Sequence, residues 1–248
     1  MMRITETVKQ LLIINVIFFI GTMIVPQAFP YLALYFPENP DFKAWQLLTH
    51  MFMHGGIGHI FFNMFALYSF GVVLEQMWGA KKFLFFYLSC GLGAALVHIG
   101  VNYIQFYQGL DVLLSNGLSK QEVLTSLNTM NFDPLQGKID QVTFDSLASA
   151  YLTPAVGASG AIYGILVAFA FMLPNAELML LFLPVPIKAK YFVPALLAID
   201  LFLGLKGNSI FGSGGDGIAH FAHLGGALVG FIMMWYWKKN QFNNNRWS

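Results

Sequence analysis

The chain has 248 residues, of which 57% are hydrophobic and only 10% are charged, and its formal net charge is +1. A soluble domain carries about 25% charged residues, so this chain lacks the charge to cover a globular surface in water. The charge balance also excludes the basic field that binds nucleic acid, and we expect no nucleic-acid partner. The composition predicts a multi-pass protein embedded in a lipid bilayer.

The first predicted span covers residues 11–25, an unbroken apolar run that ends at Pro26. Residues 26–50 hold four prolines and many aromatic side chains. This stretch predicts a loop in the interfacial layer of the membrane rather than a spanning helix. We expect the second span from His54 to about Trp78 and the third from Phe83 to about Ile104.

The chain changes character in about residues 105–150, where acidic and amide side chains appear. Within this stretch, Ser119-Lys120-Gln121-Glu122 has the form of a capping box, which predicts that a short amphipathic helix begins there. We interpret the stretch as an extramembrane insert between the third and fourth spans.

Three further spans are predicted after the insert, over Ser159–Leu173, Tyr191–Leu205 and Ala219–Trp237. The loop at 207–217 contains five glycines and is expected to be flexible. The predicted fold is therefore an all-α, polytopic bundle of six transmembrane helices, with residues 1–248 forming a single membrane domain.

Six spans place both termini on one side of the membrane. Nine of the 13 lysines and arginines would share that side and four would lie opposite. The positive-inside rule then predicts cytoplasmic termini, with the aromatic loop and the insert outside. Because the chain is compact and shows no targeting extension, we expect a bacterial inner membrane.

The fourth span begins with a serine among small residues, in Gly157-Ala158-Ser159-Gly160. Gly160 and Gly164 form a small-xxx-small face that lets another helix come close. Ser159 is either a nucleophile or one of the serines that commonly pack membrane helices, and this stretch alone leaves both open.

The sixth span carries His223, Gly226 and Gly230 at i, i+3 and i+7, so the three share one face. A histidine in a bilayer is costly, and its role is either chemical or a hydrogen bond that holds two helices together. If the two glycine faces pack on each other, Ser159 and His223 come within hydrogen-bond reach. This is the nucleophile–base geometry that acyl transfer requires.

The second span carries His59 and Asn63 at i and i+4, which point the same way. Their N–H groups, together with the backbone N–H of Ser159, would stabilise a developing oxyanion. We expect His54 to brace a loop by a hydrogen bond. Tyr163 lies on the face of Ser159, where it packs either against His223 or as an ordinary interhelical aromatic.

A metal site is the main competing use of the histidines, since His220-x-x-His223 has a ligand-like spacing. The chain has no H-E-x-x-H motif and no acidic residue next to these histidines, so we expect neither a metal nor another cofactor. Asp200 in the fifth span is interpreted as a hydrogen-bonding residue without a catalytic role.

Together these motifs resemble the rhomboid family of intramembrane serine proteases, over about residues 45–237. The resemblance implies a serine endopeptidase with a Ser159–His223 dyad, no third acidic member, and an oxyanion hole of His59, Asn63 and the Ser159 N–H. It also implies that Tyr163 stacks on His223 and that the substrates are membrane proteins cut in or near a spanning segment.

Two features depart from the family pattern. Trp45-Gln46 stands where the family often has Trp-Arg, and the insert at 105–150 is long. We expect the insert either to shape substrate access or recruit a partner, or to be a tolerated surface insertion. The alternatives are a catalytically inactive relative that binds client membrane proteins and, third, a small-solute transporter. The sequence predicts no oligomeric state.

Overall fold

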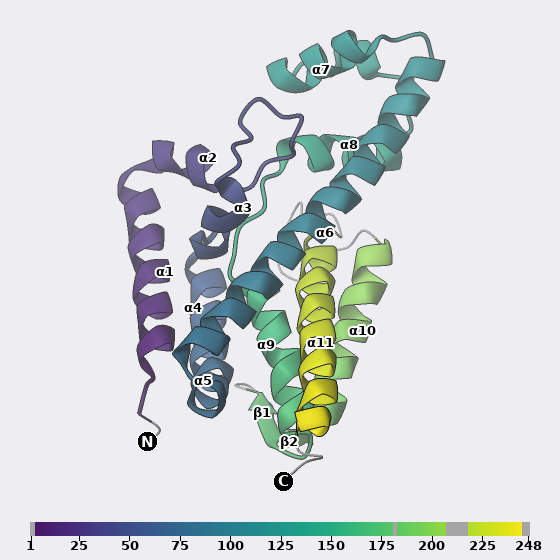
Figure 1. Cartoon of the computed structure of the whole chain (residues 1–248). Helices are drawn as coiled ribbons and strands as arrows, with labels where there is room; N and C mark the ends of the chain where they lie inside the picture. The colour runs from purple at the N-terminus through teal and green to yellow at the C-terminus, as the bar shows by residue number, and fades with distance from the viewer. Residues whose placement is uncertain (1–2, 181–182, 207–217, 245–248) are drawn as a thin grey trace.

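The computed structural model describes residues 3–180, 183–206 and 218–244 and shows a bundle of helices (Figure 1). The all-α membrane fold is confirmed. In the described residues, three helical segments are long and apolar enough to cross a membrane, namely α1, Ile57–Trp78 and α6. The count of six spans stays a prediction, and the glycine-rich stretch at 207–217 lies outside the described residues.

The first helix, α1 (Glu6–Ile24), ends before Pro26, which has no N–H to continue the helix and stands at the first position of a short 3₁₀ turn. The expected aromatic loop follows, with only short helical pieces: η1 (Pro26–Ala28), α2 (Phe29–Leu32), α3 (Gln46–Thr49) and η2 (His50–Phe52). Gln46 is fully buried and ties this loop together, because its amide nitrogen donates to the carbonyls of Pro30 and Asp41. Its amide oxygen accepts from the backbone N–H groups of residues 35 and 43.

The second span begins three residues later than predicted and contains a π-helical turn, in the order α4 (Ile57–Ala66), η3 (Leu67–Gly71) and α5 (Val72–Trp78). At its lower end in Figure 1, Glu75 accepts hydrogen bonds from the backbone N–H groups of Thr7 and Val8, each at 2.9 Å. These N–H groups belong to the first turn of α1, where a helix has no acceptors of its own. Glu75 thus binds the backbone of α1 rather than the neighbouring lysines.

The third helix is much longer than its predicted span, because α6 runs over Ala80–Ser115, 36 residues. The first part of the predicted insert therefore continues this helix. The rest of the insert forms α7 (Lys120–Thr129), η4 (Asp133–Leu135) and α8 (Gln141–Leu152). The predicted capping box at the start of α7 is confirmed, since Ser119 and Glu122 exchange both hydrogen bonds.

The insert has a hydrophobic core of its own, which includes a residue of the aromatic loop. Phe36 from that loop is 1% exposed, and its ring centroid lies 5.1 Å from that of Phe106 and 6.2 Å from that of Tyr151. Asn39 donates to the Tyr151 carbonyl at 2.8 Å. The insert and the loop therefore fold together, at the end of the molecule opposite both chain ends (Figure 1).

On the surface, an ion pair between Glu38 and Lys120 links the aromatic loop to the insert. Glu38 accepts from Lys120 at 2.8 Å and from the hydroxyl of Tyr107 at 2.6 Å. Burial favours the neutral acid, but the two hydrogen bonds outweigh it, so the pKa of Glu38 is lowered. In turn, the hydrogen bonds to Glu38 and Tyr107 raise the pKa of Lys120.

The remaining elements are α9 (Ser159–Met172), the antiparallel hairpin of β1 (Glu177–Leu180) and β2 (Leu183–Lys188), α10 (Ala189–Lys206) and α11 (Ile218–Asn244). The hairpin occupies the connection between the fourth and fifth predicted spans. α9 lies inside the bundle, against α6 and α11, and most of its side chains are buried.

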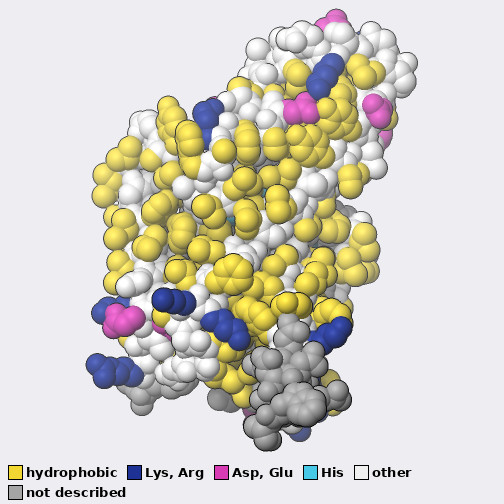
Figure 2. All heavy atoms as spheres, in the orientation of Figure 1, with side chains coloured by type: hydrophobic (Ala, Val, Ile, Leu, Met, Phe, Trp, Pro, Cys, Tyr) yellow, Lys and Arg dark blue, Asp and Glu magenta, His cyan; other side chains and the backbone are white. Residues whose placement is uncertain are grey.

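The outer surface fits a bilayer. Large apolar side chains point outward along several helices, including Ile17, Phe85, Leu96, Leu228 and Trp235, each more than half exposed. Figure 2 shows apolar side chains over the middle of one face, with lysine, arginine, aspartate and glutamate toward its two ends. Such an apolar band faces lipid in a membrane protein.

Candidate active site

Ser159 and His223 meet across two helices. Ser159 is the first residue of α9, and His223 lies in the second turn of α11. The Oγ of Ser159 is 3.0 Å from the Nε2 of His223, within hydrogen-bond distance. The His223 side chain is 21% exposed and Ser159 is partly exposed, so the pair can be reached from outside the protein.

The two glycine faces explain why these side chains come so close. A Cβ built on Gly226 would lie 1.9 Å from the carbonyl oxygen of Gly160. One turn on, a Cβ on Gly230 would lie 2.8 Å from the Cα of Gly164. α9 and α11 are therefore in backbone contact, which no residue with a side chain would allow at these positions.

Tyr163 fixes the orientation of the imidazole. Its ring is stacked on that of His223, with centroids 4.3 Å apart and planes 10° from parallel. Tyr163 is one helical turn after Ser159 on α9, as its i+4 spacing predicted. The stacked ring limits rotation of the imidazole and leaves its Nε2 directed at Ser159.

The loop before Ser159 approaches His59 closely. Gly157 has φ +126°, a conformation that glycine adopts without strain, and a Cβ there would lie 2.8 Å from the Nε2 of His59. The Nδ1 of His59 accepts from the backbone N–H of Gly55 at 3.4 Å. With Nδ1 as acceptor, the imidazole proton is on Nε2, which faces the loop that leads into Ser159.

Two more N–H donors are available beside His59. Asn63 uses one amide hydrogen on the His59 carbonyl at 3.0 Å and has a second one to donate. The N–H of Ser159 is in the first turn of α9, where N–H groups have no acceptor within the helix. The structure thus gathers the predicted oxyanion residues near the nucleophile; their catalytic roles stay a prediction.

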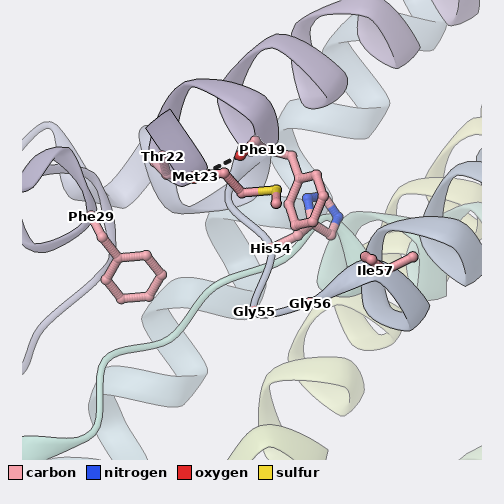
Figure 3. Close-up of a pocket in the computed structure, with 8 residues that line it drawn as sticks. All are labelled: Phe19, Thr22, Met23, Phe29, His54, Gly55, Gly56 and Ile57. Carbon is pink, nitrogen blue, oxygen red and sulfur yellow. Dashed lines mark hydrogen bonds between the residues drawn. The ribbon is translucent and has the colours of Figure 1, made fainter. Parts of the chain in front are cut away.

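His54 lies beside His59, and its role of bracing a loop stays a prediction. Its ring nitrogens are buried and make no hydrogen bond of standard geometry among the described residues, but the backbone of Phe52 in the preceding loop is near enough to interact with the ring. The ring packs edge-on against His59 with centroids 5.0 Å apart. It lines a pocket of about 360 Å³ between the end of α1 and the start of α4. Figure 3 shows the side chains of His54, Phe19 and Met23 pointing toward one another across this pocket.

Asp200 is the residue that the sequence argument set aside. Its Oδ1 lies 2.5 Å from the Nδ1 of His220 and 3.4 Å from the Nδ1 of His223. The Asp200 side chain is only 3% exposed. A carboxylate in a spanning helix is a functional candidate by default, and this signal was available in the apolar run around Asp200.

These three side chains also form a group of metal-ligand type. One donor atom from each of Asp200, His220 and His223 lies within 4.8 Å of the others. No acidic residue stands next to these histidines along the chain, but Asp200 on α10 lies beside them in space.

Comparison with known proteins gives a Rhomboid domain over residues 41–240. "Rhomboid protein 1, mitochondrial" of Saccharomyces cerevisiae is 26% identical over 94% of this chain and 53% of the relative. "Rhomboid protease AarA" of Providencia stuartii is 27% identical over 76% of this chain and 54% of the relative. "Presenilin-associated rhomboid-like protein, mitochondrial" of Homo sapiens is 27% identical over 82% and 40%.

The chain spans about half the length of these relatives or less. They include mitochondrial and bacterial proteins, so they give no support to a bacterial inner membrane over a mitochondrial one. The comparisons and the apolar helices together make this chain an integral, multi-pass membrane protein.

Proposed function

This chain belongs to the rhomboid family, and from that premise we propose that it is an intramembrane serine endopeptidase. The observation that carries the proposal is the 3.0 Å contact between Ser159 Oγ and His223 Nε2, held by backbone contact between α9 and α11. A packing serine needs no base beside it, whereas a nucleophilic serine does.

Ser159 attacks the carbonyl carbon of the scissile peptide bond while His223 Nε2 takes the hydroxyl proton. The tetrahedral intermediate collapses to an ester on Ser159, and His223 returns the proton to the leaving amine. Water then attacks the ester, again with His223 as base, and Ser159 is regenerated.

The negative charge that develops on the carbonyl oxygen is stabilised by the N–H of Ser159 and the Nε2–H of His59, with Asn63 as a further donor. The N-terminus of α9 adds the positive end of its helix dipole. Donors held in place before the reaction stabilise this charge most strongly where water is excluded, and removal of one such donor costs about 10²–10³-fold in rate.

Asp200 orients the base. Its carboxylate accepts from the Nδ1–H of His223, which keeps the proton on Nδ1 and leaves the Nε2 lone pair free for the Ser159 proton. Asp200 touches neither substrate nor nucleophile, so it acts as a positioning residue through His223.

The substrate class follows from the setting. A spanning segment presents its peptide bonds inside a helix, which must unwind locally before Ser159 can attack. The partial exposure of Ser159 and His223 supplies the access that hydrolytic water needs. We propose transmembrane proteins as substrates.

A fluorophosphonate probe on the detergent-solubilised chain tests the activated serine. We expect the wild type to be labelled, and both Ser159→Ala and His223→Ala to abolish labelling. Ser149→Ala, at an exposed hydroxyl in α8, is the matched control and should label normally. A folded wild type without labelling would refute the enzyme and favour a client-binding relative.

A further inference from the structure

The cluster of Asp200, His220 and His223 joins α10 to α11 directly beside the proposed base. The side chains are 3%, 8% and 21% exposed, respectively. Asp200 and His220 are therefore buried, and an ion would reach the cluster from solvent past His223. Buried histidine and carboxylate groups that converge on one point share either a proton or a metal ion. The mechanism uses only the contact between Asp200 and His223.

The donor atoms suit a tetrahedral divalent cation. His220 and His223 are one helical turn apart on α11, and the Nδ1 of each faces the same oxygen of Asp200, at 2.5 and 3.4 Å. Zinc takes histidine nitrogen and carboxylate oxygen at about 2.0–2.2 Å, which places two tetrahedral ligand atoms about 3.4 Å apart. A shift of about 1 Å between His220 and Asp200 would therefore admit the ion.

Asp200 has further capacity for such an ion. Its second oxygen, Oδ2, is buried and makes no hydrogen bond of standard geometry among the described residues, and the hydroxyl of Tyr163 lies close enough to interact with the same carboxylate. A carboxylate in surroundings of low dielectric constant attracts a cation more strongly than one in water. Three protein ligands also leave a fourth position for water, as open zinc sites do.

We propose that Asp200, His220 and His223 bind a divalent zinc-like cation that reversibly inhibits the enzyme, an inference that rests on the proposed function. A neutral imidazole carries one proton. While Asp200 holds that proton on Nδ1 of His223, Nε2 is free to act as base. A cation on Nδ1 moves the proton to Nε2, with no net release, and Nε2 can then no longer accept the proton of Ser159.

Binding is tested with cobalt, which replaces zinc and absorbs visible light in a tetrahedral site. Tag-free, full-length Ser159→Ala protein in detergent is titrated with Co²⁺, so that the readout is independent of activity. We expect one ion per chain, and at least tenfold weaker binding after His220→Gln or Asp200→Asn. His98→Gln, a buried histidine of α6 outside the cluster, should bind as before.

Inhibition is tested on the wild type by fluorophosphonate labelling with Zn²⁺ and then with EDTA. We expect Zn²⁺ to suppress labelling by at least tenfold, EDTA to restore it, and His220→Gln to lose most of the suppression when each variant is compared with its own metal-free rate. Absence of Co²⁺ binding, or equal weakening by His98→Gln, would overturn the site. Co²⁺ binding without an effect of Zn²⁺ on labelling would overturn the inhibitory role.

The two proposals fail separately. If the wild type is never labelled, even in EDTA, the proposed protease function fails while Co²⁺ binding still decides whether the cluster is a metal site. If labelling occurs and Co²⁺ does not bind, only the metal proposal fails.

Discussion

Gly226→Ala tests whether backbone contact between α9 and α11 sets the geometry of the reactive pair. The added Cβ would meet the Gly160 oxygen at 1.9 Å, and real Cβ contacts are essentially never under 3.0 Å, so the helices must separate by at least about 1.1 Å. Gly160 follows Ser159 directly, and Gly226 is one turn after His223. The displacement therefore acts on the pair itself, not on a distant part of the bundle.

The expected effect follows from that displacement. The Oγ–Nε2 distance of 3.0 Å would grow toward about 4 Å, beyond hydrogen-bond range. A misplacement of 1 Å can reduce a rate about 10²-fold, and overpacking destabilises a core by about 1–3 kcal/mol. We expect Gly226→Ala to slow fluorophosphonate labelling about 100-fold and to lower the melting temperature in detergent.

Gly100→Ala provides the matched control. Gly100 is an exposed glycine in α6, and a Cβ there would meet nothing within 4 Å. Replacing a glycine inside a helix by alanine then favours the helix by up to about 1 kcal/mol. Gly100→Ala should keep wild-type labelling, whereas wild-type labelling and melting of Gly226→Ala would refute the close helix contact.

Three other changes have defined outcomes. Asp200→Asn should slow labelling at least tenfold with little change in melting temperature, because it removes the charge that holds the His223 proton; an unchanged rate would exclude its positioning role. Phe36→Ala should destabilise the insert by about 3–5 kcal/mol and speed its limited proteolysis, whereas Val142→Ala, at a side chain 76% exposed, should not. The pKa of Glu38 is lower in the folded protein than in the unfolded chain, so its ion pair stabilises the fold at pH values above the unfolded pKa of about 4.3. This stabilisation is lost as the pH falls through the folded pKa, where the carboxylate becomes protonated. Glu38→Gln should therefore reduce the loss of unfolding free energy at acid pH by about 0.2–1 kcal/mol, measured from melting temperatures over a pH series. An unchanged pH dependence would contradict the assignment.

Local spacing was enough to predict much of the site. Ser159 and Tyr163 are i and i+4 on one helix, and His223, Gly226 and Gly230 share a face of another, so helical periodicity alone predicts which of them point together. The small residues then indicate that the two faces touch. His59 follows from the same spacing in the second span.

Asp200 could not be placed in this way. It is 20 residues before His220 and on another helix, so its contact depends on how α10 packs against α11. Sequence spacing fixes positions around one helix axis and says nothing about rotation of one helix relative to its neighbour.

The length of α6 was also underestimated. The predicted third span ended at Ile104 because the apolar run gives way to polar residues there, but helix formation does not need an apolar sequence. Phe106, Leu110 and Leu113 continue one buried face, now against the insert instead of lipid. The periodicity therefore persists while the hydropathy falls, and a criterion based on hydropathy ends the helix too early.

The same helix has a consequence for whatever approaches the protein from the side. Its 36 residues measure about 54 Å, while the hydrocarbon of a bilayer is about 30 Å thick. Figure 1 shows α6 inclined to α9 and α11, and a helix of this length extends beyond the hydrocarbon where α7 and α8 pack against it. A folded domain attached to a neighbouring membrane protein would therefore share the space just outside the bilayer with this part of α6 and with the insert that packs on it.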